Sequence, residues 1–505
     1  MGPGRKLFKI KRLQTTKMVV FLVCCETKLT YEILISFEDV IIVQNQALNA
    51  TDIKLPWRQK FGWATGDFAQ NLIYTTISTY LLFFYTNVYG LPAADAATMF
   101  LIVRLIDAIN DPIVGTFIDK HTTRFGKYRG YLLYMGLPLA VLAMLCFYVP
   151  DFSQMGKLVY AYVTYVGLSV IYTTVNIPYG SLNAAMTRNN KELVSMSSIR
   201  MFLANMGSLT VSFGVPVCVK LFSGGYYSGA ASKMGWFLTM VVYGIAGALV
   251  LVFCFSQSTE RIHMPADTEA SVSVKDLFHQ LKINQPLRVL AIFFIITFGL
   301  MSVVNSVGAY YMTYNAHNAG LMQWYNLLGT LPAFLTVPIT PWLNRKLGTQ
   351  VLMQGSLLVI VIGFLIMFMV PATNITWTFI GRAIEAAGVT LSTGFQWALV
   401  PQVITYGEWK TGKRENGIVN AIVGFFFKFG MALGGVIPGY VLAAYGFVAN
   451  HQQTAHSLFG IRMTTTIIPI IVTILAMIVF AFYRLTDEKI EQMNEEISQR
   501  SAAKD

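Results

Sequence analysis

The chain has 505 residues, of which 55% are hydrophobic and only 12% are charged, and its net charge is +12. Soluble domains usually carry about 25% charged residues, so the composition excludes an ordinary soluble protein. Continuous apolar runs of about 20 residues exclude a β-barrel and indicate an all-α polytopic membrane protein. The basic residues are spread over short loops without forming a basic face, so we expect no nucleic-acid partner.

Residues 1–56 do not match the rest of the chain. A basic start is followed by an apolar run at 18–25 that is too short to span a membrane. No small-residue cleavage site follows closely, which argues against a signal peptide. We expect this segment to be a disordered extension or the product of an upstream mis-start.

From residue 57 onward, apolar stretches alternate regularly with short polar loops. We predict twelve transmembrane helices, at 63–85, 94–118, 130–149, 158–182, 194–221, 236–255, 290–314, 322–343, 351–370, 376–400, 417–442 and 459–483. Six precede and six follow the polar middle segment at 257–288. The predicted architecture is therefore two six-helix bundles, at 57–256 and 289–484, followed by a charged tail at 485–505.

The lysines and arginines of the short loops predict the orientation of the chain in the membrane. They concentrate in the middle segment and in the loops after residues 118, 182, 343 and 400. Positively charged loops stay in the cytoplasm, so we expect both termini to be cytoplasmic. Two six-helix halves joined by a cytoplasmic loop are typical of a major-facilitator transporter, and we expect a monomer in the plasma membrane.

The second predicted span contains an unusual group of polar residues. Asp107 and Asp111 lie one helical turn apart, with Arg104 and Asn110 on the same side. A charged side chain at mid-bilayer costs about 2.5–3.5 kcal/mol even on lenient scales. Two carboxylates are tolerated there if a cation lies between them, if one is protonated, or if a basic group pairs with them. Arg104 supplies only one nearby partner.

Other spans also carry polar side chains, which usually face a cavity and mark a substrate or ion path. They are Asp67, Thr173, Asn176, Arg200, Arg382, Glu385 and Lys428. Each also has a structural interpretation. Asp67 and Arg200 would form an interhelical ion pair, Arg382 and Glu385 would pair locally as i,i+3 neighbours, and Lys428 would neutralise a carboxylate.

These residue types favour a cation-coupled transporter with a polar central cavity. Carboxylate, amide and hydroxyl oxygens suit a hard cation such as Na⁺, although the same carboxylates can carry a proton. Tyr179, Gln396 and Trp397 can hydrogen-bond to or stack on a hydroxyl-rich substrate. The expected ligands are a small sugar or glycoside and a monovalent cation, with no prosthetic cofactor.

The chain resembles the glycoside–pentoside–hexuronide:cation symporter family from about residue 57 to residue 500. The resemblance depends on short motifs that occur in the family's order, at 66–68, 83–86, 107–112, 126–127, 176–179 and 406–412. The resemblance implies a cation site made by Asp107, Asn110, Asp111 and Thr173. It further implies that Asp67 and Arg200 bind the sugar, and that Lys428 lies near the cation site. All four residue types of the cation site are present, which favours Na⁺ without excluding H⁺ or Li⁺.

The fourth span departs from the family's pattern. The family's best-known member has an aspartate and a tryptophan where this chain has Asn176 and Gly180. Asn176 still hydrogen-bonds to hydroxyl groups but has no charge, and Gly180 offers no stacking surface. These changes argue against an α-galactoside. They are compatible with a pentoside such as a xyloside, or with a hexuronide.

Two other functions remain open from the sequence. One is cation-coupled transport of a lysolipid or other amphiphile, and the other is a membrane sensor with a degenerate transporter fold. We do not expect an enzyme, because the sequence has no nucleophile–base pair, no cluster of metal ligands and no phosphate-binding loop.

Overall fold

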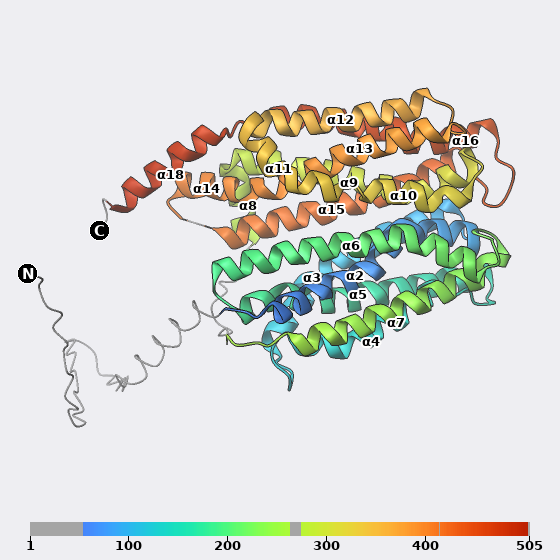
Figure 1. Cartoon of the computed structure of the whole chain (residues 1–505), viewed down its shortest axis with the longest axis horizontal. Coiled ribbons are helices and arrows are strands. Elements are labelled where there is room, and N and C mark those ends of the chain that lie inside the picture. Colours follow the sequence, from blue (N-terminus) through green and yellow to red (C-terminus); the bar gives the residue numbers. More distant parts are fainter. Residues whose placement is uncertain (1–53, 263–273, 414, 503–505) are drawn as a thin grey trace, which may run out of the picture. The chain divides into compact units, whose positions relative to one another are not determined.

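The computed structural model describes residues 54–262, 274–413 and 415–502, and within these ranges it is helical (Figure 1). The predicted extension at 1–56 falls almost entirely outside them. The helices of the first half are α2 (Trp57–Phe84), α3 (Ala93–Lys120), α4 (Arg129–Cys146), α5 (Gln154–Met186), α6 (Asn190–Phe222) and α7 (Lys233–Gln257). The short helix α8 (Val274–Ile283) lies in the middle segment, as its amphipathic sequence predicts.

The second half follows the same plan with more interruptions. Its helices are α9 (Gln285–Tyr310), α10 (Met322–Thr330), α11 (Ala333–Leu347), α12 (Thr349–Met369), α13 (Ile375–Gln396), α14 (Val400–Thr411), α15 (Asn416–Ala444), α16 (Ala455–Arg462), α17 (Ile468–Ala481) and α18 (Asp487–Ala502). The predicted span at 322–343 is two helices, because Pro332 cannot continue the hydrogen-bond ladder of α10. The predicted span at 376–400 passes through a short 3₁₀ turn, η5 (Trp397–Leu399), and continues into α14.

Eight helical stretches in the described part of the chain are long and apolar enough to cross a membrane. They begin at Arg129, Gln154, Lys191, Ala230, Gln285, Thr349, Asn416 and Ala455. The other four predicted spans are α2, α3, the broken pair α10–α11, and α13. Of these, α3 carries Arg104, Asp107 and Asp111, and α13 carries Arg382 and Glu385. Charges of this kind lower hydropathy and are tolerated where a helix lines a polar cavity.

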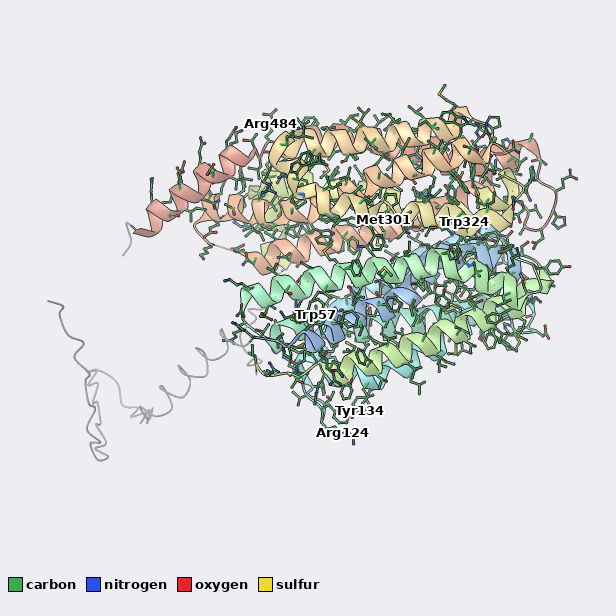
Figure 2. All side chains as sticks on the ribbon, in the orientation of Figure 1. Trp57, Arg124, Tyr134, Met301, Trp324 and Arg484 are labelled. Carbon is green, nitrogen blue, oxygen red and sulfur yellow. The ribbon has the colours of Figure 1, made fainter. Side chains whose placement is uncertain are left out.

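Helices of each half pack mainly on one another (Figure 1). In the first half, α2 contacts α6 and α7, while α4 contacts α5 and α7. In the second half, α9 contacts α15 and α17, and α12 contacts α13. The halves meet where α15 packs on α3, α10 on α6, and α9 on α2. Trp324 of α10 lies edge-on against Phe213 of α6, with ring centroids 5.3 Å apart (Figure 2).

Hydrogen bonds also join the halves near the C-terminal end of α2. There α2 continues into a π-helix, η1 (Tyr85–Tyr89), and α9 continues into another, η3 (Tyr311–Asn315). The hydroxyls of Thr86 and Tyr310 lie 2.7 Å apart, and the Tyr314 hydroxyl donates to the Asn87 side chain. Asn326 of α10 donates to the Tyr80 hydroxyl at 2.8 Å. The two halves are therefore closed against each other at this end.

Glycines set the distance between α9 and α15. A Cβ atom on Gly434 would lie 2.0 Å from the backbone oxygen of Gly299, which is far inside van der Waals contact. We expect Gly434→Ala to destabilise the protein by about 1–3 kcal/mol or more, because the helix backbones must separate. Thermal unfolding of the purified protein measures this. Gly424→Ala is the matched control on the same helix, since its Cβ would meet no atom within 4 Å. Equal unfolding temperatures for the two variants would contradict the close approach.

Candidate functional site

A polar cavity of about 280 Å³ lies among α2, α3, α5, α6 and α15. Its lining includes many of the polar residues that the sequence placed inside spans: Asp67, Asp107, Thr173, Asn176, Arg200 and Lys428. Asn71, Tyr74, Arg104, Ser169 and Tyr172 complete the polar surface. Charged groups from four helices thus share one cavity within predicted membrane spans, as expected for a transport path rather than for scattered structural pairs.

Oxygen atoms of α3 and α5 converge on one side of this cavity. The Ser169 hydroxyl donates to Asp107 Oδ1 at 2.6 Å. The Thr173 hydroxyl lies 3.2 Å from Asp107 Oδ1 and 3.1 Å from Asp111 Oδ1. One hydroxyl hydrogen cannot satisfy both carboxylates at once, so an additional positive charge is favourable there. No group of three His, Cys, Asp or Glu side chains converges within the described ranges, so this is not a dense acidic metal site.

Lys428 of α15 supplies a positive charge. Its ammonium forms an ion pair with Asp111 Oδ2, as the structural interpretation of the sequence predicted. Lys428 belongs to the second half of the chain and Asp111 to the first, so this contact crosses between the halves. The oxygens that would hold a cation are therefore partly occupied by a group of the protein itself.

Asn110 is not brought into this cluster. It does not line the cavity, and its amide nitrogen is buried without a hydrogen-bond partner among the described residues. Asn110 and Asp111 are consecutive on α3 and therefore point in different directions. Of the four predicted cation ligands, the structure thus brings together Asp107, Asp111 and Thr173.

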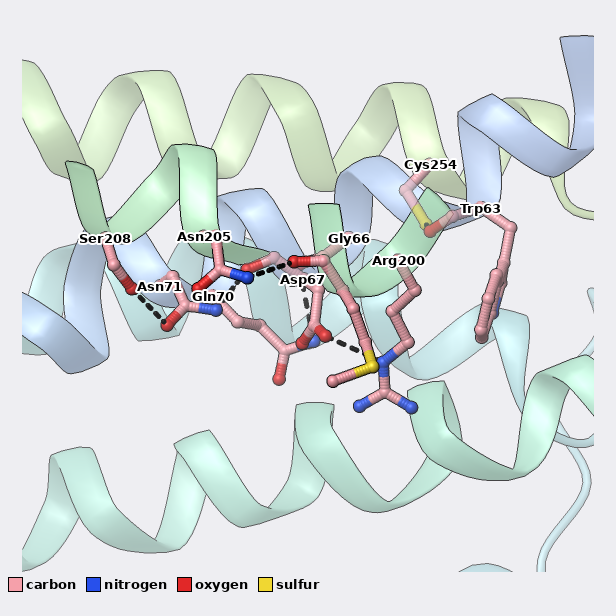
Figure 3. A network of polar contacts seen from close by, with 10 residues as sticks. Trp63, Gly66, Asp67, Gln70, Asn71, Arg200, Asn205, Ser208 and Cys254 are labelled. Atoms are coloured by element: carbon pink, nitrogen blue, oxygen red, sulfur yellow. Dashed lines mark hydrogen bonds and ion pairs between the residues drawn. The ribbon is translucent and has the colours of Figure 1, made fainter. Parts of the chain in front are cut away.

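A second charged pair lies farther along the cavity (Figure 3). The Arg200 Nε donates to Asp67 Oδ2 at 2.7 Å, which joins α6 to α2. Both side chains remain partly accessible, with 32% and 16% of their surface exposed, so they can still reach a ligand in the cavity. The backbone oxygen of Asp67 accepts from the Asn71 side chain at 2.9 Å, and Ser208 donates to Asn71 in turn.

Tyr179 packs against Arg200 of this pair. Its ring stacks on Trp63 with centroids 5.2 Å apart, and the Arg200 guanidinium lies 5.1 Å from the Tyr179 centroid. Tyr179 is fully buried and does not line the cavity. It is therefore placed to orient Arg200 by a cation–π contact rather than to touch a substrate.

The two departures in the fourth span both lie on α5. Asn176 lines the cavity, whereas Gly180 is not among the lining residues. A Cβ at Gly180 would meet no atom within 4 Å, so there is open space at the position of the missing tryptophan. On this helix the cavity therefore has a hydrogen-bonding amide, and its aromatic lining comes from Tyr165 and Tyr172 rather than from position 180.

Gln396 and Trp397 do not line this cavity. Gln396 is completely buried, and its side-chain oxygen accepts from Thr297 of α9 at 3.0 Å. Trp397 packs edge-on against Phe294, with centroids 5.1 Å apart, and is 42% exposed. Both belong to an aromatic and amide contact between α9 and the end of α13. Their residue types suit a sugar site, but the helix face that carries them points elsewhere.

Ser169 and Asn71 are site residues that the sequence did not predict. Ser169 precedes Thr173 by four residues on α5 and therefore lies on the same helix face. Asn71 stands in the same relation to Asp67 on α2. In both cases the sequence offered one signal, which is the i,i+4 spacing from a predicted site residue on the same helix.

Comparison with known proteins identifies the family of the chain. A family model described as "MFS/sugar transport protein" matches residues 62–487. The chain is 50% identical to the uncharacterized symporter YnaJ of Bacillus subtilis (strain 168), over 88% of this chain and 96% of that protein. It is 36% identical to the isoprimeverose transporter of Lactiplantibacillus pentosus, over 89% and 92% of the two chains.

A solved structure of a bacterial homologue of the lysosomal transporter Spinster shares the fold, with a TM-score of 0.64 and 12% identity over 87% of this chain and 99% of that one. The chain therefore belongs to the MFS/sugar transport protein family, within its glycoside/hexuronide:cation symporters, and it is a multi-pass membrane transporter, not an enzyme.

Proposed function

We propose that this transporter couples the uptake of a glycoside to a monovalent cation, with Na⁺ favoured over H⁺. The observation that carries the proposal is one cavity lined by Asp107 and Thr173 and by the Asp67–Arg200 pair, with Asp111 hydrogen-bonded to Thr173. The hard oxygen ligands of the first group suit Na⁺. The charged groups of Asp67 and Arg200 and the amide of Asn176 suit the hydroxyls of a sugar. They disfavour the apolar chain of a lysolipid.

The proposed architecture is twelve membrane spans in two six-helix bundles, in a monomer of the plasma membrane with both termini in the cytoplasm. In this orientation the hydrogen bonds between η1 and η3 lie on the extracellular side. We propose that the bundles rock about the shared cavity, so that this closure opens when substrate enters.

A xylose-containing glycoside is the proposed substrate class. The absence of an aspartate and a tryptophan at positions 176 and 180 disfavours a galactoside, and the relative in Lactiplantibacillus pentosus is named for isoprimeverose. Arg200 is already paired with Asp67, so this arginine has less positive charge to offer to a uronic acid.

The decisive measurement is the affinity of the purified protein for isoprimeverose with and without Na⁺ at constant pH. Because coupling is reciprocal, each ligand must raise the affinity for the other by the same factor. We expect Na⁺ to raise the glycoside affinity by about 5- to 150-fold. If the glycoside affinity did not change with Na⁺, sodium coupling would be rejected. If the affinity changed with pH instead, the coupling would be assigned to H⁺.

A further inference from the structure

A second cavity of about 230 Å³ adjoins the first. The two share Asn71, Tyr74 and Met431 as lining residues. The Tyr74 hydroxyl lies 3.4 Å from the Met431 sulfur, so one contact between α2 and α15 separates the two spaces. Two side chains, rather than a backbone segment, form this partition.

The second cavity differs from the first in its walls. It is lined by α2 and α6 on one side and by α9, α10 and α13 on the other, so both halves of the chain contribute. Its polar groups are mostly neutral hydroxyls and amides, including Thr75, Ser78, Asn205, Asn305, Thr390 and Thr393. Neutral donors and acceptors at this density suit a polyhydroxylated ligand better than an ion or an apolar chain.

Glu385 of α13 adds an acceptor to this wall. Arg382 pairs with one oxygen of its carboxylate, which neutralises the charge. The other oxygen, Oε2, is buried and has no hydrogen-bond partner among the described residues. Glu385 is fully buried, and Gly363 of α12 packs closely against its backbone. A buried acceptor without a donor is unfavourable unless a ligand supplies one.

The Arg382 side chain is itself held firmly. Its Nε donates to the Tyr325 backbone oxygen at 3.4 Å, and its guanidinium lies 4.8 Å from the Tyr325 ring centroid. The ion pair is therefore pre-organised by α10 and α13. This confirms that Arg382 and Glu385 pair locally, and it leaves the unpartnered oxygen as the feature that a local pair does not explain.

We propose that the second cavity is the subsite for the second sugar ring of a two-ring glycoside whose first ring binds beside Asp67 and Asn176. This inference depends on the proposed function, and it adds that the transported glycoside has two sugar rings. The hydroxyls of the second ring donate to Glu385 and exchange hydrogen bonds with Asn305 and Thr393. The side chains of Tyr74 and Met431 must move apart so that the glycosidic link can pass between the cavities.

Two probes separate the subsites: isoprimeverose, which has two rings, and methyl α-D-xyloside, which has one. Titration calorimetry on the purified full chain in Na⁺ compares the wild type with Asn305→Leu, which removes an amide without disturbing the Arg382–Glu385 pair. We expect Asn305→Leu to weaken isoprimeverose binding by about 5- to 10-fold and methyl α-D-xyloside binding by less than about 2-fold. Asn420→Leu on the exposed face of α15 is the matched control and should change neither affinity.

Thr393→Val provides a second test, because it keeps the side-chain shape and removes the hydroxyl. Equal losses for the two probes, or no loss for isoprimeverose in both variants, would overturn the second subsite and leave the proposed function standing. If the wild type bound neither probe, glycoside transport itself would be rejected, and the subsite with it.

Discussion

Asp107→Cys and Asp111→Cys are each expected to abolish cation-driven accumulation while sparing some sugar binding. Each substitution removes a carboxylate from the oxygen cluster and leaves the Asp67–Arg200 pair intact. One charge moving through 100 mV supplies about 2.3 kcal/mol, which corresponds to about 50-fold accumulation. Without a coupled ion this driving force is lost, so the internal and external concentrations should become equal. Uptake of labelled isoprimeverose into energised vesicles measures the accumulation, and counterflow measures the remaining sugar binding.

Asp95→Cys is the matched control for these variants. Asp95 lies in the first turn of the same helix, is exposed, and does not line the cavity. Its substitution should leave accumulation unchanged. Full accumulation by both cavity variants would show that neither carboxylate binds the driving ion.

The second large effect is expected for Arg200→Ala. This variant leaves the Asp67 carboxylate without its partner and removes a donor from the sugar site. Truncating one member of a hydrogen-bonded charge pair costs about 2–5 kcal/mol where the pair is buried. Since Arg200 is about one-third exposed, we expect the lower end of this range, or a roughly 30- to 100-fold loss of glycoside affinity. Titration calorimetry measures the affinity, and thermal unfolding checks that the variant folds.

Arg188→Ala serves as the control, because Arg188 is an exposed arginine in the loop between α5 and α6. An Arg200→Ala variant that kept wild-type affinity would assign the Asp67–Arg200 pair to interhelical packing alone. Arg200→Lys adds a finer test. Lysine keeps the charge but not the planar group that lies over Tyr179, so it should restore binding only in part.

The sequence predicted the positions of the long apolar helices well, because an apolar run of about 20 residues has few alternatives in a protein. It also identified Asp107 and Asp111, since a carboxylate inside an apolar helix is costly wherever it points. It could not decide which way a neutral polar residue faces. Gln396, the last residue of α13, and Trp397 of η5 therefore do not reach the cavity, whereas Ser169 of α5 does and was not predicted.

The sequence patterns also could not predict the irregularities of the backbone, namely the π-helices and the break in a helix at Pro332. The π-helices η1 and η3 occur in ordinary apolar and tyrosine-rich segments. The side chains of η1 form hydrogen bonds to Tyr310 and Tyr314, more than 220 positions away in the sequence. The break at Pro332 was visible as a proline, but prolines at 112, 178 and 438 lie inside continuous helices. Whether a proline ends a helix depends on the packing around it, which the local sequence does not encode.

The contact between Lys428 and Asp111 has a consequence for how the ion leaves. Because Lys428 is part of α15, it competes with the ion for Asp111 at an effective concentration that is set by the fold and not by the solution. On the proposed function, the ion binds most tightly when α15 carries the ammonium away from α3, and it is displaced when the ammonium returns. On this proposal, release of the ion into the cytoplasm is assisted by a side chain of the protein itself.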